Sequence, residues 1–101
     1  MIAEFSVVPV GRGEELADLV AQVVDIIDRS GLPYQLTAMG TLIEGDWDSV
    51  LALIKECHLQ MRQHASRVLT RVSIDDRDGA RNRLTGKIRD MEKILGREVR
   101  K

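Results

Sequence analysis

Residues 33–50 read PYQLTAMGTLIEGDWDSV and carry the pattern from which the rest of the chain can be interpreted. Two short strand-like runs, YQLTA and MGTLIEG, follow each other directly, which is typical of a β-hairpin. A hairpin that only had to bury one face would contain fewer polar side chains, so we expect some of them to contact something outside the core. These polar residues are Gln35, Thr37, Thr41 and Glu44.

Upstream of this hairpin the pattern changes from strand to helix. Residues 2–10 (IAEFSVVPV) alternate in strand fashion, and Pro9 with the GRG sequence at 11–13 ends the run. Residues 14–30 have apolar side chains at helical spacing, two glutamates at the start and Gly31 after the end, as helix-end preferences favour. The apolar positions of this predicted helix are Leu16, Leu19, Val20, Val23, Ile26 and Ile27.

Downstream of the hairpin the sequence again predicts a helix and then a strand. Asp46 is a suitable N-cap for a helix with Trp47 in its first turn. Residues 67–75 (RVLTRVSID) alternate and predict a strand, and a last helix follows the DRDG sequence at 76–79. The apolar positions are Val50, Leu53, Ile54, Cys57 and Met61 in the first of these helices, and Leu84, Ile88, Met91 and Leu95 in the second.

The predicted order is β-α-β-β-α-β with an added C-terminal helix, in a single domain covering residues 1–101. This order is typical of the α+β class and of the ferredoxin-like fold, in which two helices cover one face of a four-stranded antiparallel sheet. The first and last predicted strands, at 2–10 and 67–75, would each have a second face that mixes polar and apolar side chains. Such a face usually contacts water, a ligand or a second subunit. Glu4 and Arg71 on that face are predicted either to form an exposed ion pair or to anchor a subunit interface. The other polar residues there are Ser6, Ser73 and Asp75.

The composition excludes several classes of protein. The chain is 44% apolar and 31% charged, which is typical of a globular domain and not of a disordered one. No apolar run approaches the roughly 20 residues of a membrane span, and three aromatic residues are too few for a base-stacking surface. A single cysteine excludes an intrachain disulfide, and the first residues do not resemble a signal peptide, so we predict a cytoplasmic protein without a membrane partner.

Charge is distributed unevenly, although the net charge is only −1. Residues 1–76 contain twelve acidic and six basic side chains, whereas residues 77–101 contain four acidic and nine basic ones. Such asymmetry indicates a nucleic-acid surface, a solvated helix face, or a surface that complements another across an oligomer. Because acidic and basic residues alternate along the last helix, we favour the latter two and do not expect nucleic acid as a partner.

No pattern typical of a catalytic or metal site stands out. Cys57 lies on the apolar side of its predicted helix and is expected to be a buried structural thiol. His58 and His64 are six residues apart, which places them on different helix faces and predicts surface positions instead of a shared metal ion. The GRG turn lacks the other glycines and the lysine of a phosphate-binding loop. We therefore predict no catalytic residue, no metal and no cofactor.

Three segments together resemble a known family: MIAEFSVVPVG at 1–11, the hairpin at 33–50, and RVLTRVSIDDR at 67–77. They are similar to segments of the small thiamine-binding, YkoF-like family, which has long been catalogued as uncharacterised. The resemblance covers essentially the whole chain. Its strongest motif is YQLTAMGTLIEG, in which Ala38 stands where relatives often have proline.

The resemblance implies a ferredoxin-like protomer whose sheets pack face to face in a dimer, with two dimers pairing into a homotetramer. It also implies that thiamine (vitamin B1) or its hydroxymethylpyrimidine part binds between subunits, without catalysis. In that role Gly40 would let a flat ring approach the backbone, and Met39 would either pack on the ring or be a plain core residue. The ligand contacts implied by the resemblance are Ser6, Thr37, Met39, Gly40, Thr41, Glu44 and, less securely, Arg71.

Three functions follow from these observations. The prediction is a non-catalytic binding protein for thiamine or a related pyrimidine, held near a subunit interface. One alternative is an oligomeric interaction or regulatory module without such a ligand. The other is a small enzyme that uses a cavity of the ferredoxin-like fold, which rests on analogy between folds alone.

Overall fold

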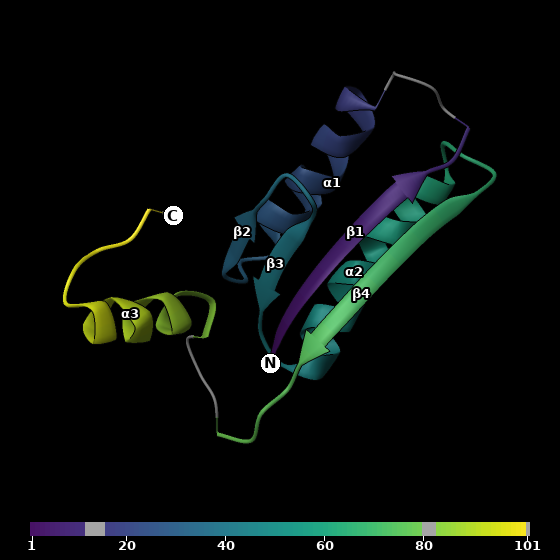
Figure 1. Ribbon diagram of the computed structural model, residues 1–101. Coiled ribbons are helices and arrows are strands. Elements are labelled where there is room, and N and C mark those ends of the chain that lie inside the picture. The colour runs from purple at the N-terminus through teal and green to yellow at the C-terminus, as the bar shows by residue number, and fades with distance from the viewer. Residues whose placement is uncertain (12–15, 80–82, 101) are drawn as a thin grey trace.

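A computed structural model describes residues 1–11, 16–79 and 83–100 (Figure 1). Parts of the predicted turn at 11–13 and of the predicted helix start at 14–15 therefore lie outside the described residues. The predicted α+β, ferredoxin-like order is confirmed. Its elements are β1 (Ile2–Pro9), α1 (Ala17–Arg29), β2 (Tyr34–Leu36), β3 (Thr41–Glu44), α2 (Trp47–Arg62), β4 (Val68–Asp75) and α3 (Arg83–Leu95).

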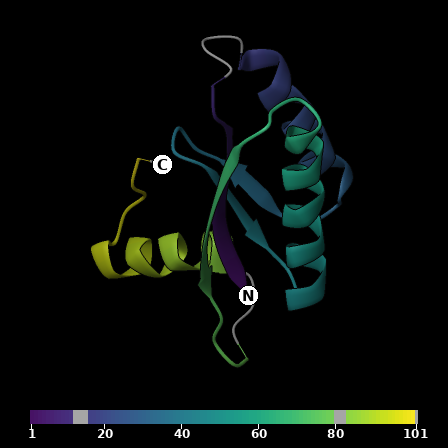
Figure 2. The same ribbon diagram turned by 90° about the vertical axis from the view of Figure 1, so that its right-hand side faces the viewer.

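The four strands form one antiparallel sheet in the order β2-β3-β1-β4. Ala3 pairs with Ile43 on one side and with Ile74 on the other, so these residues share one face of the sheet. Helices α1 and α2 cover this face, whereas α3 lies on the opposite side (Figure 2). We call the face away from α1 and α2 the open face.

The core fills the space between the sheet and the two covering helices. Phe5 and Ile43 from the sheet pack there against buried residues of both helices. The apolar stripe predicted for α2 is buried in full, and that of α1 is buried except for half-buried Leu16 and for Val20, which is 48% exposed. The helical residues in the core are Leu19, Val23, Ile26, Ile27, Val50, Leu53, Ile54, Cys57 and Met61.

Local sequence signals set the ends of these helices. The carboxylate of Asp46 accepts a hydrogen bond from the backbone N–H of Ser49 at 3.1 Å, which confirms the predicted N-cap of α2. Hydrogen bonding to the side chain of Ser49, and then to its backbone N–H, lowers the pKa of Asp46. Gly31 has a positive φ of +77° directly after the end of α1, as expected for a residue that stops a helix.

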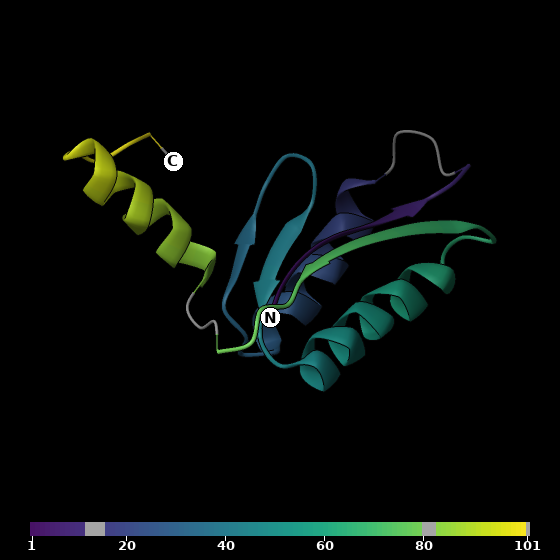
Figure 3. The ribbon, with the colours of Figure 1, turned by 60° about the horizontal axis from the view of Figure 1, so that its bottom comes forward.

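The C-terminal helix α3 stands apart from this two-layer unit (Figure 3). No described residue of α3 is buried, and its main contact is with β3. Of its predicted apolar line, Leu84 and Ile88 are half-buried, whereas Met91 is 59% exposed and Leu95 is 52% exposed. The apolar side of α3 is thus covered only near its beginning.

Candidate functional site

The turn between β2 and β3 is closed by one threonine side chain. The hydroxyl of Thr37 donates to the carbonyl oxygen of Gly40 at 2.8 Å, and it accepts from the backbone N–H groups of Met39 and Gly40 at 3.2 and 3.1 Å. The backbone N–H of Thr37 donates to the same Gly40 oxygen at 2.9 Å. A hydroxyl has one proton and two lone pairs, so this side chain is fully used within the turn.

Gly40 brings the turn close to β1. A Cβ atom at this position would lie 2.8 Å from the carbonyl oxygen of Phe5 and 3.4 Å from its carbon. Backbone atoms leave no room for a side chain here, and this explains why glycine occupies the position. The sequence did not indicate this packing role. Its approach to a ligand ring stays a prediction.

Met39 lies at the tip of the turn and is 84% exposed, so the alternative of a plain core methionine is wrong. The turn is flanked by two concave regions. The first, which we call the hairpin cavity, has a volume of about 260 Å³ and lies between the turn and α1. Its lining includes Ser6, Val20, Thr37, Met39, Gly40 and Thr41.

The second region lies on the open face, and we call it the sheet hollow. It has a volume of about 470 Å³ and combines polar with apolar side chains from β1 and β4. Both Val8 and Leu69 expose about half of their surface there, at 44% and 50%. Met39 borders the hollow as it borders the hairpin cavity. The polar residues of its lining are Glu4, Ser6, Arg71 and Ser73.

The structure brings six of the seven predicted ligand contacts to these two regions. Ser6 and Met39 line both, whereas Arg71 lines only the sheet hollow. The side chain of Thr41 is buried, and its residue pairs with Phe5 on the helix-covered face. Thr37, Gly40 and Thr41 therefore contribute to the hairpin cavity alone.

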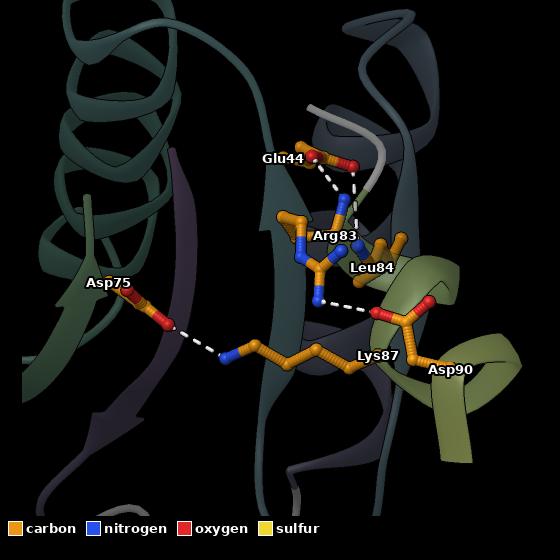
Figure 4. Close-up of polar contacts among 6 residues, drawn as sticks. All are labelled: Glu44, Asp75, Arg83, Leu84, Lys87 and Asp90. Carbon is orange, nitrogen blue, oxygen red and sulfur yellow. Dashed lines mark hydrogen bonds and ion pairs between the residues drawn. The ribbon is translucent and has the colours of Figure 1, made fainter. Parts of the chain in front are cut away.

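Glu44, the seventh residue, lines neither region and holds α3 instead. Its carboxylate accepts from the backbone N–H of Arg83 at 2.7 Å and from that of Leu84 at 3.3 Å (Figure 4). These are first-turn N–H groups that have no partner within a helix, and a negative charge is favourable at this helix end. Glu44 thus caps a helix that begins 39 residues later in the chain. A contact between Glu44 and a ligand stays a prediction.

Replacing Glu44 with glutamine should loosen α3. Glutamine keeps one acceptor oxygen but loses the second acceptor and the charge, and losing a helix cap costs about 1 kcal/mol. Amide hydrogen exchange in residues 84–88 should accelerate roughly fivefold, while exchange in β1 stays unchanged. Glu56→Gln, an exposed change on α2, is the matched control. Unchanged exchange in α3 would show that Glu44 does not hold the helix.

Glu4 and Arg71 do not face each other directly. Glu4 pairs with Ser73 and Arg71 pairs with Ser6, so the two charged residues are diagonal neighbours on the open face. Among the described residues, the ion pairs within 4.0 Å do not include these two. The predicted cross-strand ion pair is therefore absent from this part of the chain, and both charges are available to the sheet hollow. The sequence pattern placed Glu4 and Ser73 on this face, but it did not indicate them as ligand contacts.

The other candidate side chains serve the interior. Cys57 is fully buried, as predicted, and burial raises the pKa of its thiol to about 11. Nδ1 of His58 is hydrogen-bonded to Oγ1 of Thr70 on β4 at 2.6 Å. Surface positions were predicted for His58 and His64, but both residues are half-buried. Within the described residues, no three histidine, cysteine or acidic side chains are arranged to hold a metal ion. No helix in the described ranges has the length and apolar character needed to span a membrane.

Comparison with known proteins gives a consistent result. A UPF0045 protein of Mycobacterium tuberculosis is 35% identical over 96 residues, which span 94% of each chain. A UPF0045 protein of Methanocaldococcus jannaschii is 30% identical over 89 residues, or 88% of this chain and 89% of the relative. Its crystal structure matches with a TM-score of 0.81, covering 89% of this chain and 93% of that one.

A candidate thiamine biosynthesis/salvage protein of Thermotoga maritima shares the fold, with a TM-score of 0.78 and 21% identity over 89% of this chain and 96% of that one. Residues 3–92 match the family model described as "Thiamine-binding protein". This match extends from β1 well into α3. The chain therefore belongs to the thiamine-binding protein family.

Proposed function

We propose that this protein binds thiamine or its hydroxymethylpyrimidine part, without catalysis, in the sheet hollow. The observation that carries the proposal is the hollow itself, because about 470 Å³ lies within the roughly 300–1,000 Å³ typical of small-molecule sites. It combines apolar walls with a few polar groups, as such sites usually do. Membership of the thiamine-binding family supports the choice of ligand.

The chemistry of the lining suits an aminopyrimidine that is joined to a positively charged ring. The Glu4 carboxylate would accept a hydrogen bond from the exocyclic amine, and the Ser6 hydroxyl would donate to a ring nitrogen. Val8 and Leu69 would contact the flat faces of the ligand. Met39 would fold over the ring from the tip of the hairpin, where its thioether is exposed and unbranched.

A second subunit would complete the site. The hollow is open on one side, and Val8 and Leu69 remain about half exposed beside it. We propose that the open faces of two protomers pack together over the ligands and that two such dimers form a tetramer, in a reducing cytoplasm that keeps the single cysteine free. Light scattering should then give four times the protomer mass at micromolar concentration, and a stable monomer would contradict this assembly.

Replacing Glu4 with glutamine should weaken thiamine binding about tenfold. Glutamine keeps the size of the side chain but not its charge, and hydrogen bonds to charged groups are roughly twice as strong as neutral ones. Calorimetric titration of the wild type and Glu4→Gln with thiamine and with hydroxymethylpyrimidine measures the difference. The matched control is Glu56→Gln, which removes the same charge from an exposed position on α2.

The results also separate the alternatives. Equal affinities for wild type and Glu4→Gln would remove Glu4 from the site. If no pyrimidine binds but the protein is a tetramer, the open face serves assembly alone, and the protein is an oligomeric module without such a ligand.

A further inference from the structure

A group of basic side chains gathers where α3 approaches the end of the sheet. Arg77, Arg83 and Lys87 line a cavity of about 110 Å³ together with Asp75, Ile2 at the start of β1 and the preceding Met1. We call this the cationic cavity. We infer that it binds the phosphate group of a small organic phosphate, which is a site separate from the sheet hollow.

The charges in the cationic cavity favour an anion. Among the residues that the structure describes, the lining contains one carboxylate, that of Asp75, and three positively charged side chains. Nζ of Lys87 lies 2.7 Å from Oδ2 of Asp75 (Figure 4). The pKa of Asp75 is lowered, first by the hydrogen bond and charge of Lys87 and then by the charges of Arg77 and Arg83. The lowered pKa shows that the cations stabilise the negative charge of this carboxylate, and the same cations would stabilise a bound phosphate.

Neighbouring acidic groups, among them Glu44 at the backbone N–H of Arg83, reduce this positive charge without lining the cavity. Asp90 accepts from the guanidinium of Arg83 at 3.2 Å, so one of the three cations is partly neutralised. Asp76 and Asp78 are exposed and do not line the cavity. Arginine can hold a phosphate through two parallel hydrogen bonds, and lysine provides three donors, of which one is used by Asp75.

An adjoining space has room for the rest of the ligand. A cleft of about 490 Å³, which we call the α3 cleft, lies between the open face and the first turns of α3. It shares Ile2, Asp75, Arg83 and Lys87 with the cationic cavity, so the two spaces are adjacent. Its volume is in the range of small-molecule sites, whereas 110 Å³ is too small for a heteroaromatic group. The cleft is also lined by Gln35, Leu42, Leu84 and Ile88, and it borders the sheet hollow at Glu4 and Ser73, whereas the cationic cavity shares no lining residue with that hollow.

The position of α3 makes this a formed site. The two hydrogen bonds from Arg83 and Leu84 to Glu44 fix the first turn of α3 against β3. The same turn carries Arg83 and is followed by Lys87, one helical turn later. The cavity is therefore lined by one cation that follows β4 and by two cations from the first turns of a helix whose start is fixed, and charges placed in advance favour anion binding.

Titration with pyrophosphate, followed by amide chemical shifts, tests the phosphate position without an organic group. Arg77→Gln and Lys87→Gln should each weaken binding about tenfold, whereas Arg89→Gln should leave it within twofold. Arg89 is exposed on the same helix and does not line the cavity, so the control removes the same charge. Equal weakening by all three variants, or no saturable binding to the wild type, would overturn the proposal.

Asp75→Asn gives a result of opposite sign. It removes the carboxylate that competes for Lys87, so pyrophosphate should bind about three to ten times more tightly. Weaker binding would show that Asp75 holds the cations in place and would contradict the assigned role. Both side chains of the Lys87–Asp75 ion pair are more than half exposed, so breaking the pair should cost little stability. Circular dichroism should therefore show that Asp75→Asn and Lys87→Gln are folded.

Two organic phosphates then test the α3 cleft and identify the class of ligand. Adenosine monophosphate and thiamine monophosphate should bind more tightly than inorganic phosphate if the α3 cleft contacts the organic part. Lys87→Gln should weaken the binding of both, which separates binding here from binding of thiamine in the sheet hollow. The tighter of the two shows whether a nucleotide or a vitamin phosphate is preferred. Equal affinities for inorganic phosphate and the two organic phosphates would show that the α3 cleft is not part of the site. Pyrophosphate contains no pyrimidine, so the pyrophosphate titrations do not depend on whether thiamine binds in the sheet hollow.

Discussion

Replacing Gly40 with alanine is expected to lower the free energy of unfolding by about 2–3 kcal/mol. The added Cβ would lie 2.8 Å from the carbonyl oxygen of Phe5. Phe5 belongs to the central strand β1, which is paired with β3 on one side and with β4 on the other. Because both neighbours hold β1 in register, its backbone cannot move away from the new methyl group, and the hairpin turn must shift instead.

Urea denaturation followed by circular dichroism measures this loss. Gly45→Ala is the matched control, since a Cβ there would meet side-chain methyl groups of Leu32 and Val50 at 3.2 Å. The half-buried Leu32 can rotate away more easily than a strand can move, so we expect less than half of the effect. Similar losses in both variants would show that the close approach of Gly40 to β1 has no special cost.

Raising the pH from 8 to 11 should remove about 2–3 kcal/mol of stability through Cys57 alone. Burial raises the pKa of this thiol from 9.0 to about 11 in the folded protein. Between these values the thiol of the unfolded chain loses its proton while that of the folded protein keeps it. The unfolded state then binds fewer protons, and stability must fall as the pH rises through this window.

The comparison of wild type with Cys57→Ala isolates this contribution, because all other groups titrate in both proteins. Alanine leaves a small cavity, so the variant should be less stable at pH 8, but the difference between the two proteins should shrink toward pH 11. Unfolding curves in urea at several pH values provide the measurement. Parallel pH profiles would contradict the raised pKa, as would rapid labelling of the native thiol at pH 8.

Local patterns were sufficient to predict most of the fold. The apolar positions of α2 follow helical spacing, and the Asp46 cap depends on a residue only three positions away. The alternation in β4 correctly separated Val72 from Arg71, because neighbouring residues of a strand always face opposite sides. Such features depend on the nearest residues in the chain, which a single sequence displays directly.

Features that depend on contacts between distant segments could not be predicted in this way. The role of Gly40 beside Phe5 depends on how β3 approaches β1, and the sequence does not state that distance. The resemblance implied a ligand contact for Glu44 because this residue lies within the motif YQLTAMGTLIEG, yet its carboxylate accepts from N–H groups 39 and 40 residues later. Thr37 is different, since its bonds lie within the turn and a threonine before a tight turn is a recognisable local signal.

The central position of β1 has a consequence for how the protein is made. Of the four strands of this sheet, β1 comes first in the chain, yet it is flanked by β3 and β4, and Ile2 pairs with Asp75 at the end of β4. One edge of β1 therefore stays without its partner until nearly the whole sheet has been synthesised. Contacts so distant in sequence close slowly, and an unpaired apolar strand is prone to aggregation meanwhile. This topology favours completion of the sheet only after β4 has been synthesised.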